Sequence, residues 1–191
     1  RQVEGLRAQT LAPERFEWVV CLNGCGERAR PELERLGLPF GLRVFETVAR
    51  LPVGAARNAC AERTCGSILL FSDDDCAPAP DRLAAHVALQ ESGLCVALEA
   101  SGGARRRRWW RRLTRAGRLV SCAGWSVPGT VFRSLGGFED GRDEREQVER
   151  ALASRLVRAG LAFRPLQAGS WCVEGAGDGL REEAASMEDA R

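Results

Sequence analysis

The sequence predicts an α/β fold, in which helices pack against a sheet of buried strands. Two observations carry this prediction. Short apolar runs bounded by turn residues alternate along the chain with longer segments whose apolar residues recur at helical spacing. The chain has 191 residues, 45% of them hydrophobic and 28% charged, which is the size and composition of one ordinary globular domain.

The first half of the chain contains three predicted strands and the helices that connect them. The runs at 17–22, 42–45 and 67–71 are short, apolar and bounded by turn residues, which favours buried strands. Helices are expected at 3–9, 28–36, 55–63 and from Pro80-Asp81 onward, the last with Leu83 and Val87 on its inner face.

The second half contains an irregular stretch and then a long helix. Strands are expected at 94–98 and around Phe163, and regular structure is expected again at 127–133. A helix from about Glu146 to Ala159 is indicated by a stripe of apolar residues at helical spacing: Val148, Ala151, Leu152, Leu156 and Ala159. We therefore expect one domain over residues 1–172 and a loosely ordered acidic tail over 173–191.

Composition disfavours several classes of protein. A net charge of +2 provides no global field that would attract nucleic acid or a membrane, and no apolar run approaches the roughly 18–20 residues of a membrane span. The eight cysteines include no CxxC pair and the chain has one histidine, so a zinc site is not expected. We expect reduced cysteines that pack as small apolar side chains, and a cytoplasmic protein.

Three consecutive carboxylates, Asp73, Asp74 and Asp75, directly follow the predicted strand at 67–71. They therefore lie at the carboxyl end of this strand. In open α/β sheets, ligands bind at the edge formed by the carboxyl ends of the strands. Asp73 and Asp75 are two positions apart, so their side chains point to the same side in extended backbone. Two such oxygen ligands suit Mg²⁺ or Mn²⁺ shared with a substrate phosphate. A solvated, Asp-rich turn is the alternative.

Five segments occur in the order typical of glycosyltransferase family 2, which the chain resembles. They are GAARN at 54–58, GSILLFSDDD at 66–75, PAPD at 78–81, VFRSLGGF at 131–138 and RLVRAG at 155–160. Residues 6–10 and 16–25 are similar to the family's first helix end and to its second strand with the nucleotide-binding turn. The resemblance covers about residues 5–170.

This resemblance implies a GT-A fold, with a mixed, mainly parallel sheet flanked by helices. It implies transfer of a sugar, with inversion, from a nucleoside diphosphate sugar to an acceptor hydroxyl. Mg²⁺ or Mn²⁺ held by Asp75, with help from Asp73, would stabilise the charge on the departing diphosphate. The residues expected to contact the nucleotide sugar are Asn23, Arg57, Asn58, Asp73 and Asp74. A salt bridge on the helix surface is the alternative for Arg57.

The sequence departs from the family pattern in three places. Nothing before Arg1 corresponds to the family's first, central strand, so we expect a fragment or an incomplete nucleotide pocket. The turn after the second strand has Asn23 where the family usually has Asp, which leaves the choice of nucleotide open. The family's catalytic acid pair can be aligned with this sequence in more than one register. We expect Glu149 to be the base, with Glu146 as the second candidate and Asp143 as the third. An acidic helix start that interacts with the helix dipole is the alternative for each.

A basic segment, Arg105–Arg112, places six arginines around two tryptophans. In the family this region lies near the acceptor, so we expect peripheral contact with an anionic membrane, at its inner face, and consider a lipid-linked acceptor. A solvated loop whose tryptophans pack on the core is the alternative, and nucleic acid is not expected as a partner. Two rival functions stay open, a non-catalytic binding module of the GT-A type and a nucleotidyltransferase.

Overall fold

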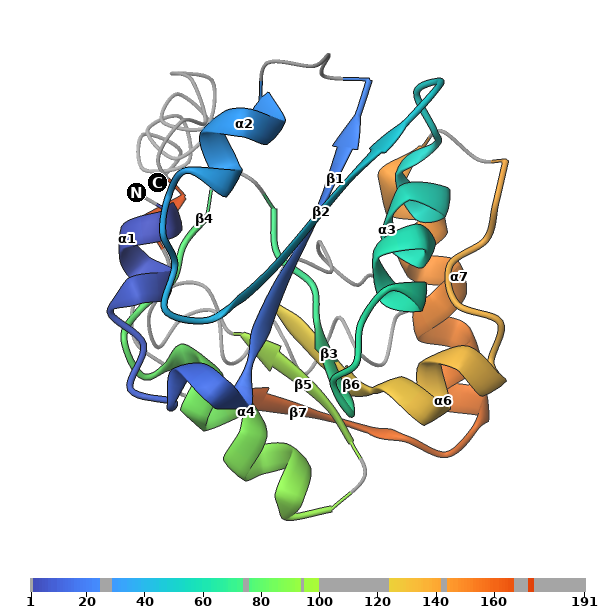
Figure 1. Cartoon of the computed structure of the whole chain (residues 1–191). Helices are drawn as coiled ribbons and strands as arrows, with labels where there is room; N and C mark the ends of the chain where they lie inside the picture. The colour runs from blue at the N-terminus through green and yellow to red at the C-terminus, as the bar shows by residue number, and fades with distance from the viewer. Residues whose placement is uncertain are drawn as a thin grey trace, which may run out of the picture.

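The computed structural model contains both helices and strands, which alternate along the chain up to residue 70 (Figure 1). The structure describes residues 2–24, 29–73, 76–93, 95–99, 124–141, 144–166 and 172–173. The helices are α1 (Gln2–Arg7), α2 (Ala29–Glu34), α3 (Val53–Glu62), α4 (Arg82–Glu91), α6 (Gly129–Ser134) and α7 (Arg145–Arg158), and a 3-10 turn spans Pro13–Arg15. The strands are β1 (Glu17–Asn23), β2 (Gly41–Thr47), β3 (Ile68–Leu70), β4 (Cys76–Ala77), β5 (Cys95–Glu99), β6 (Trp125–Pro128), β7 (Ala162–Leu166) and β8 (Cys172–Val173). The predicted α/β class is confirmed.

The expected strands at 17–22, 42–45, 67–71 and 94–98 are confirmed as β1, β2, β3 and β5, with ends that shift by at most two residues. The regular stretch at 127–133 divides instead into β6 and α6. Pro128 is the last residue of β6 and the N-cap of α6, and its φ of −58° and ψ of 129° are non-helical, so the helix begins at Gly129. The two-residue strands β4 and β8 were not predicted, because they are too short to show any periodicity.

The strands form a mixed sheet in separate hydrogen-bonded groups. β1 and β2 run parallel, from the pair Glu17 and Gly41 to the pair Asn23 and Thr47. A second group has the order β3-β6-β5-β7, in which β6 runs antiparallel to both neighbours and β5 runs parallel to β7. β4 and β8 pair antiparallel. Among the described strands, the parallel pairings β1–β2 and β5–β7 are longer than the antiparallel ones, so the predicted mixed, mainly parallel sheet is confirmed.

One edge of β1 faces a cavity. Among the described strands, β1 pairs with β2 alone. Four consecutive residues of β1, from Trp18 to Cys21, line the same cavity. Because successive side chains of a strand point to opposite faces, a cavity that touches consecutive residues lies along the edge of the strand. Residues Ser72 and Asp73, which follow β3, line it as well.

The hydrophobic core lies between α7, α6 and the strands β3, β5 and β6. Phe71, Phe132 and Phe138 meet with ring centroids 5.1 to 5.4 Å apart. The predicted stripe of α7 is buried at Val148, Leu152 and Leu156, whereas Ala159 is exposed beyond the end of the helix. None of the helices in the described ranges combines the length and the apolar character needed to cross a bilayer.

The inner face of α4 is polar, which corrects the sequence prediction. Leu83 and Val87 are only partly buried, whereas Arg82, His86 and Gln90 are buried at spacings of four residues. The cause is a polar partner on the sheet, since Nδ1 of His86 lies 2.8 Å from Oγ of Ser126. The amide of Gln90 donates to Oγ and to the backbone oxygen of Ser126, at 3.0 Å each. Ser126 is fully buried in β6, so its hydroxyl needs these partners.

Candidate active site

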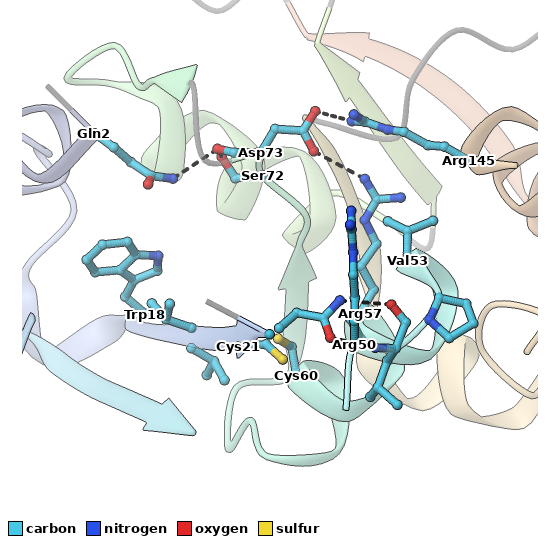
Figure 2. A pocket seen from close by; sticks show the side chains of 17 residues that line it. Gln2, Trp18, Cys21, Arg50, Val53, Arg57, Cys60, Ser72, Asp73 and Arg145 are labelled. Atoms are coloured by element: carbon cyan, nitrogen blue, oxygen red, sulfur yellow. Dashed lines mark hydrogen bonds and ion pairs between the residues drawn. The ribbon is translucent and has the colours of Figure 1, made fainter. Parts of the chain in front are cut away.

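The cavity beside β1 has a volume of about 1010 Å³ and is lined by charged residues at one end. Its walls come from β1, the start of α3, the residues after β3 and the first residue of α7. Figure 2 shows Arg57 and Arg145 approaching Asp73 from two sides of this space. The charged end therefore lies where the carboxyl ends of β1 and β3 meet, as expected for a ligand site in an α/β sheet.

We call the three consecutive carboxylates at 73–75 the acid cluster. Asp73 is the member of this cluster that the structure describes. Its Oδ1 accepts a hydrogen bond from Nη2 of Arg57 at 3.2 Å, and its Oδ2 accepts one from Nη2 of Arg145. The side-chain amide of Gln2 donates to the backbone oxygen of Asp73 at 3.1 Å, which fixes the turn after β3 against α1. Asp73 thus faces the cavity with both carboxylate oxygens bonded to arginine.

Glu149 lies next to Asp73, on α7. Its side chain is 1% exposed, and its Oε1 accepts from Nη1 of Arg57 at 3.0 Å and from Nε of Arg145 at 3.1 Å. We call these four residues the ion cluster: Arg57, Asp73, Arg145 and Glu149. Two positive and two negative charges make the cluster neutral, so the buried carboxylate of Glu149 has cationic partners.

The pKa of Arg145 reflects this arrangement. Burial alone would lower the pKa of its guanidinium. The hydrogen bond and charge of Asp73, followed by those of Glu149, outweigh burial and raise the pKa above its ordinary value. Arg145 is therefore a permanent cation at the mouth of the site.

Close packing of α3 on the segment before α7 brings Arg57 to Glu149. A Cβ at Gly54, in the first turn of α3, would lie 2.6 Å from the backbone oxygen of Glu139 and 2.9 Å from Cγ1 of Val148. Glycine therefore lets the start of α3 pack directly against α7. Arg57 follows one turn later, and its guanidinium lies 5.5 Å from the ring centroid of Phe138.

Asn58 has structural contacts with a neighbouring turn, and its contact with the nucleotide stays a prediction. Its amide nitrogen donates to the backbone oxygen of Phe138 at 2.9 Å, and its Oδ1 accepts from the backbone nitrogen of Phe138 at 2.8 Å. Arg155 supports the same turn by donating to the backbone oxygens of Leu135 and Gly137 at 2.5 and 2.6 Å. Gly137 adopts a φ of +64° in this turn, a value that favours glycine.

Asn23 lines the cavity, but its amide group is already engaged. Its nitrogen donates to the backbone oxygen of Leu51 at 2.9 Å, and its Oδ1 accepts from the backbone nitrogen of Leu51 at 2.7 Å. Oγ1 of Thr47 donates to the same Oδ1 at 3.1 Å. Asn23 therefore orders the loop between β2 and α3, and its contact with the nucleotide stays a prediction.

Several of the predicted residues lie outside the part of the chain that the structure describes. Asp74, Asp75 and Asp143 lie outside the described residues, as do the basic segment Arg105–Arg112 and, apart from residue 173, the predicted tail. Glu146 lies in the first turn of α7, and its side chain is not described. Arg145 was missed by the sequence analysis, although its spacing of four residues from Glu149 on a helix was an available signal.

The residues of the site fit a hard divalent cation in chemistry, with one condition. Carboxylate oxygens are the ligands that Mg²⁺ and Mn²⁺ prefer, and Asp73 places one such group in the cavity. In the described part of the chain, no cluster of three or more metal-ligating side chains occurs. Both oxygens of Asp73 accept from arginine, so a cation at Asp73 would compete with these hydrogen bonds and would be repelled by the guanidinium charges.

Comparison with known families identifies the chain. A family model described as glycosyl transferase family 2 matches residues 1–149, which include β1, α3, the acid cluster and α7 up to Glu149. The chain belongs to this family. No curated protein sequence matches it.

Solved glycosyltransferases share the fold. Residues 1–349 of S. aureus TarS, solved with UDP-GlcNAc, are 15% identical with a TM-score of 0.73, and the match covers 88% of this chain and 52% of that one. The mannosyltransferase PcManGT from Pyrobaculum calidifontis, solved with GDP-Man and Mn²⁺, is 18% identical with a TM-score of 0.69, and the match covers 87% and 50%. The fold is thus of the GT-A type, and this family 2 chain spans about half the length of these relatives.

Proposed function

We propose that this family 2 chain is the core of an inverting, divalent-metal-assisted glycosyltransferase that uses a nucleoside diphosphate sugar. The observation that carries the proposal is Glu149, a buried carboxylate linked to Asp73 of the acid cluster through Arg57 and Arg145. Through these two arginines, a candidate base on α7 is connected to a candidate metal ligand after β3. Membership of the family and the solved relatives support the choice of donor class.

Glu149 is proposed as the base that takes the proton from the acceptor hydroxyl during attack on the sugar. A base must lie within hydrogen-bond reach of that hydroxyl, and its carboxylate must be ionised. Both described contacts of Glu149 with arginine use Oε1. These contacts fix the orientation of the carboxylate, so the role of Arg57 and Arg145 toward the base is positioning.

The metal would be held by Asp75 together with Asp73. When bound, Mg²⁺ or Mn²⁺ would act as a Lewis acid on the diphosphate of the donor. Arg57 lies within 3.2 Å of Asp73 and is 13% exposed, so it holds this ligand in place from the protein side. PcManGT, which shares the fold and was solved in complex with GDP-Man and Mn²⁺, supports the proposal of a divalent metal.

Binding of nucleotide in the presence and absence of Mn²⁺ tests the donor and metal assignments. Calorimetry with UDP, GDP and their sugars should find one nucleotide whose affinity depends on Mn²⁺. Asp75→Ala should abolish that dependence, and Asp74→Ala should change it much less. Metal-independent binding, or equal loss from alanine at all three aspartates, would contradict the proposal. Binding without release of nucleotide from the sugar donor would favour the alternative of a non-catalytic module.

The acceptor is proposed to be a hydroxyl on a lipid-linked molecule at an anionic membrane, contacted through Arg105–Arg112. The support is the charge of this segment, since each basic residue near an anionic surface contributes about 1 kcal/mol. Co-sedimentation with vesicles should increase with the fraction of anionic lipid and decrease when Arg105–Arg108 are replaced by Gln. Vesicle binding that does not change with lipid charge or with salt concentration would contradict the proposed contact with an anionic membrane.

A further inference from the structure

Arg145 differs from the other members of the ion cluster in its exposure. Its side chain is 44% exposed, compared with 20% for Asp73, 13% for Arg57 and 1% for Glu149. It is the first residue of α7 and lines the cavity. Arg145 is therefore the member of the cluster that a molecule in the cavity would meet first.

Arg57 contacts both acids of the cluster without help from Arg145. Its Nη1 donates to Glu149 and its Nη2 donates to Asp73, at 3.0 and 3.2 Å. Removal of Arg145 would therefore leave each carboxylate with one guanidinium partner. Arg57 itself is buried against Phe138, so it has less freedom to leave.

In the structure, Arg145 contacts both groups that the proposed reaction needs, the carboxylates of Asp73 and Glu149. A divalent cation at Asp73 would lie beside the charge of Arg145 and be repelled by it. Glu149 is 1% exposed and is contacted by Arg145, so an acceptor hydroxyl cannot reach it in this state. Both conflicts are reduced if Arg145 swings away from the two carboxylates while Arg57 stays in contact with them.

We propose that Arg145 is a donor-binding residue that moves from Asp73 and Glu149 to the diphosphate of the nucleotide sugar. This inference rests on the proposed function. A guanidinium matches phosphate oxygens as it matches carboxylate oxygens, so Arg145 exchanges one anion for another. The exchange uncovers Asp73 for the cation and Glu149 for the acceptor in the same step. In the absence of donor, Arg145 holds both groups closed.

Two affinities that change in opposite directions test this exchange. In Arg145→Gln, the affinity for Mn²⁺ alone, measured by the loss of its free electron paramagnetic resonance signal, should increase several-fold because the repelling charge is gone. The affinity for UDP or GDP with Mn²⁺, measured by calorimetry, should fall about tenfold because a charged hydrogen bond to phosphate is lost. Arg145→Lys keeps the charge but not the fork, so it should restore weak Mn²⁺ binding and only part of the nucleotide affinity.

Arg158→Gln is the matched control, since this arginine lies on the same helix, is exposed and donates to the backbone oxygen of Ser154. It should change neither affinity, and far-ultraviolet circular dichroism should show that all variants are folded. If wild-type protein binds nucleotide and Arg145→Gln leaves both affinities unchanged, or lowers both, the role of Arg145 is overturned. If wild-type protein binds no nucleotide with Mn²⁺, the proposed function fails, and this inference fails with it.

Discussion

The guanidinium of Arg57 donates to the carboxylate of Glu149 at 3.0 Å, across 92 positions of sequence. Arg57 belongs to α3 and Glu149 to α7, so this ion pair ties the two helices together at the cavity. The side chains are 13% and 1% exposed, and the pair is therefore shielded from solvent. It has a structural and a chemical consequence, and each can be measured.

Arg57→Gln should lower the free energy of unfolding by about 3 kcal/mol, the lower end of the usual cost of removing one partner from a buried ion pair. The cost is at the lower end because Arg145 still contacts Glu149 at 3.1 Å. Urea denaturation of the two proteins gives the difference. Arg158→Gln, at an exposed position, should stay within about 0.5 kcal/mol of wild type. Equal stability of the two variants would show that the pair contributes nothing.

Glu149→Gln should lower the rate of sugar transfer by roughly 10²–10⁴-fold while leaving the affinity for nucleotide and metal nearly unchanged. The glutamine keeps the size of the side chain and removes its ability to accept a proton. Release of nucleotide from the sugar donor in the presence of acceptor measures this rate. Glu146→Gln should have little effect. The reverse result would make Glu146 the base, and no effect from either would place the base outside α7.

Gly54→Ala should lower the free energy of unfolding by about 1–3 kcal/mol, the usual cost of overpacking a tight contact. The new methyl group would press on the backbone oxygen of Glu139, at 2.6 Å, and α3 would have to move. Nucleotide affinity should fall as well, because Arg57 moves with α3. Gly66→Ala is the control, since a Cβ there would have its nearest contact at 3.5 Å. Chemical denaturation of both variants gives the two free energies of unfolding. A similar loss of stability in both would contradict the tight contact assigned to Gly54.

Cys60 should react with iodoacetamide far more slowly than Cys65 at pH 8. Burial, followed by the charge of Cys21, raises the pKa of the Cys60 thiol from 9.0 to about 12, so little thiolate is present. Cys65 is exposed. Because the folded state holds the proton of Cys60 more tightly, its contribution to stability is complete below pH 9 and is lost as the pH rises toward 12. Peptide mapping after timed alkylation would show the order of reaction, and faster reaction at Cys60 would exclude this account.

Sequence periodicity predicted most helices and strands because each is built from a local pattern. The stripe of Val148, Leu152 and Leu156 was visible in the sequence because burial recurs every three or four residues on a helix. The face of α4 was assigned wrongly for the opposite reason. Its buried residues, such as His86, are polar, and they are buried because Ser126 lies opposite them in β6. Such a partner is set by the tertiary fold and leaves no periodic signal.

The candidate site shows the same division. Glu149 was favoured from its place beside the apolar stripe, and the structure buries it. The amides of Asn23 and Asn58 are expected at the nucleotide, and the structure adds that both bond backbone groups of neighbouring loops. An asparagine that bonds a loop cannot be told from one that bonds a ligand by its sequence position. The spacing of Arg145 from Glu149 was visible in the sequence, whereas its contact with Asp73, 72 positions away, is set by the tertiary fold.

The edge of β1 that faces the cavity has a consequence for amide hydrogen exchange. In a parallel pair, the backbone N–H groups of successive residues point alternately toward the partner strand and away from it. Those of β1 that point to β2 are protected in the ladder from Glu17 to Asn23, and the alternate ones point into the cavity. One strand therefore carries two populations of amides with different exchange rates. A ligand or a peptide segment that fills the cavity would slow only the faster population, so exchange along β1 reports occupancy residue by residue.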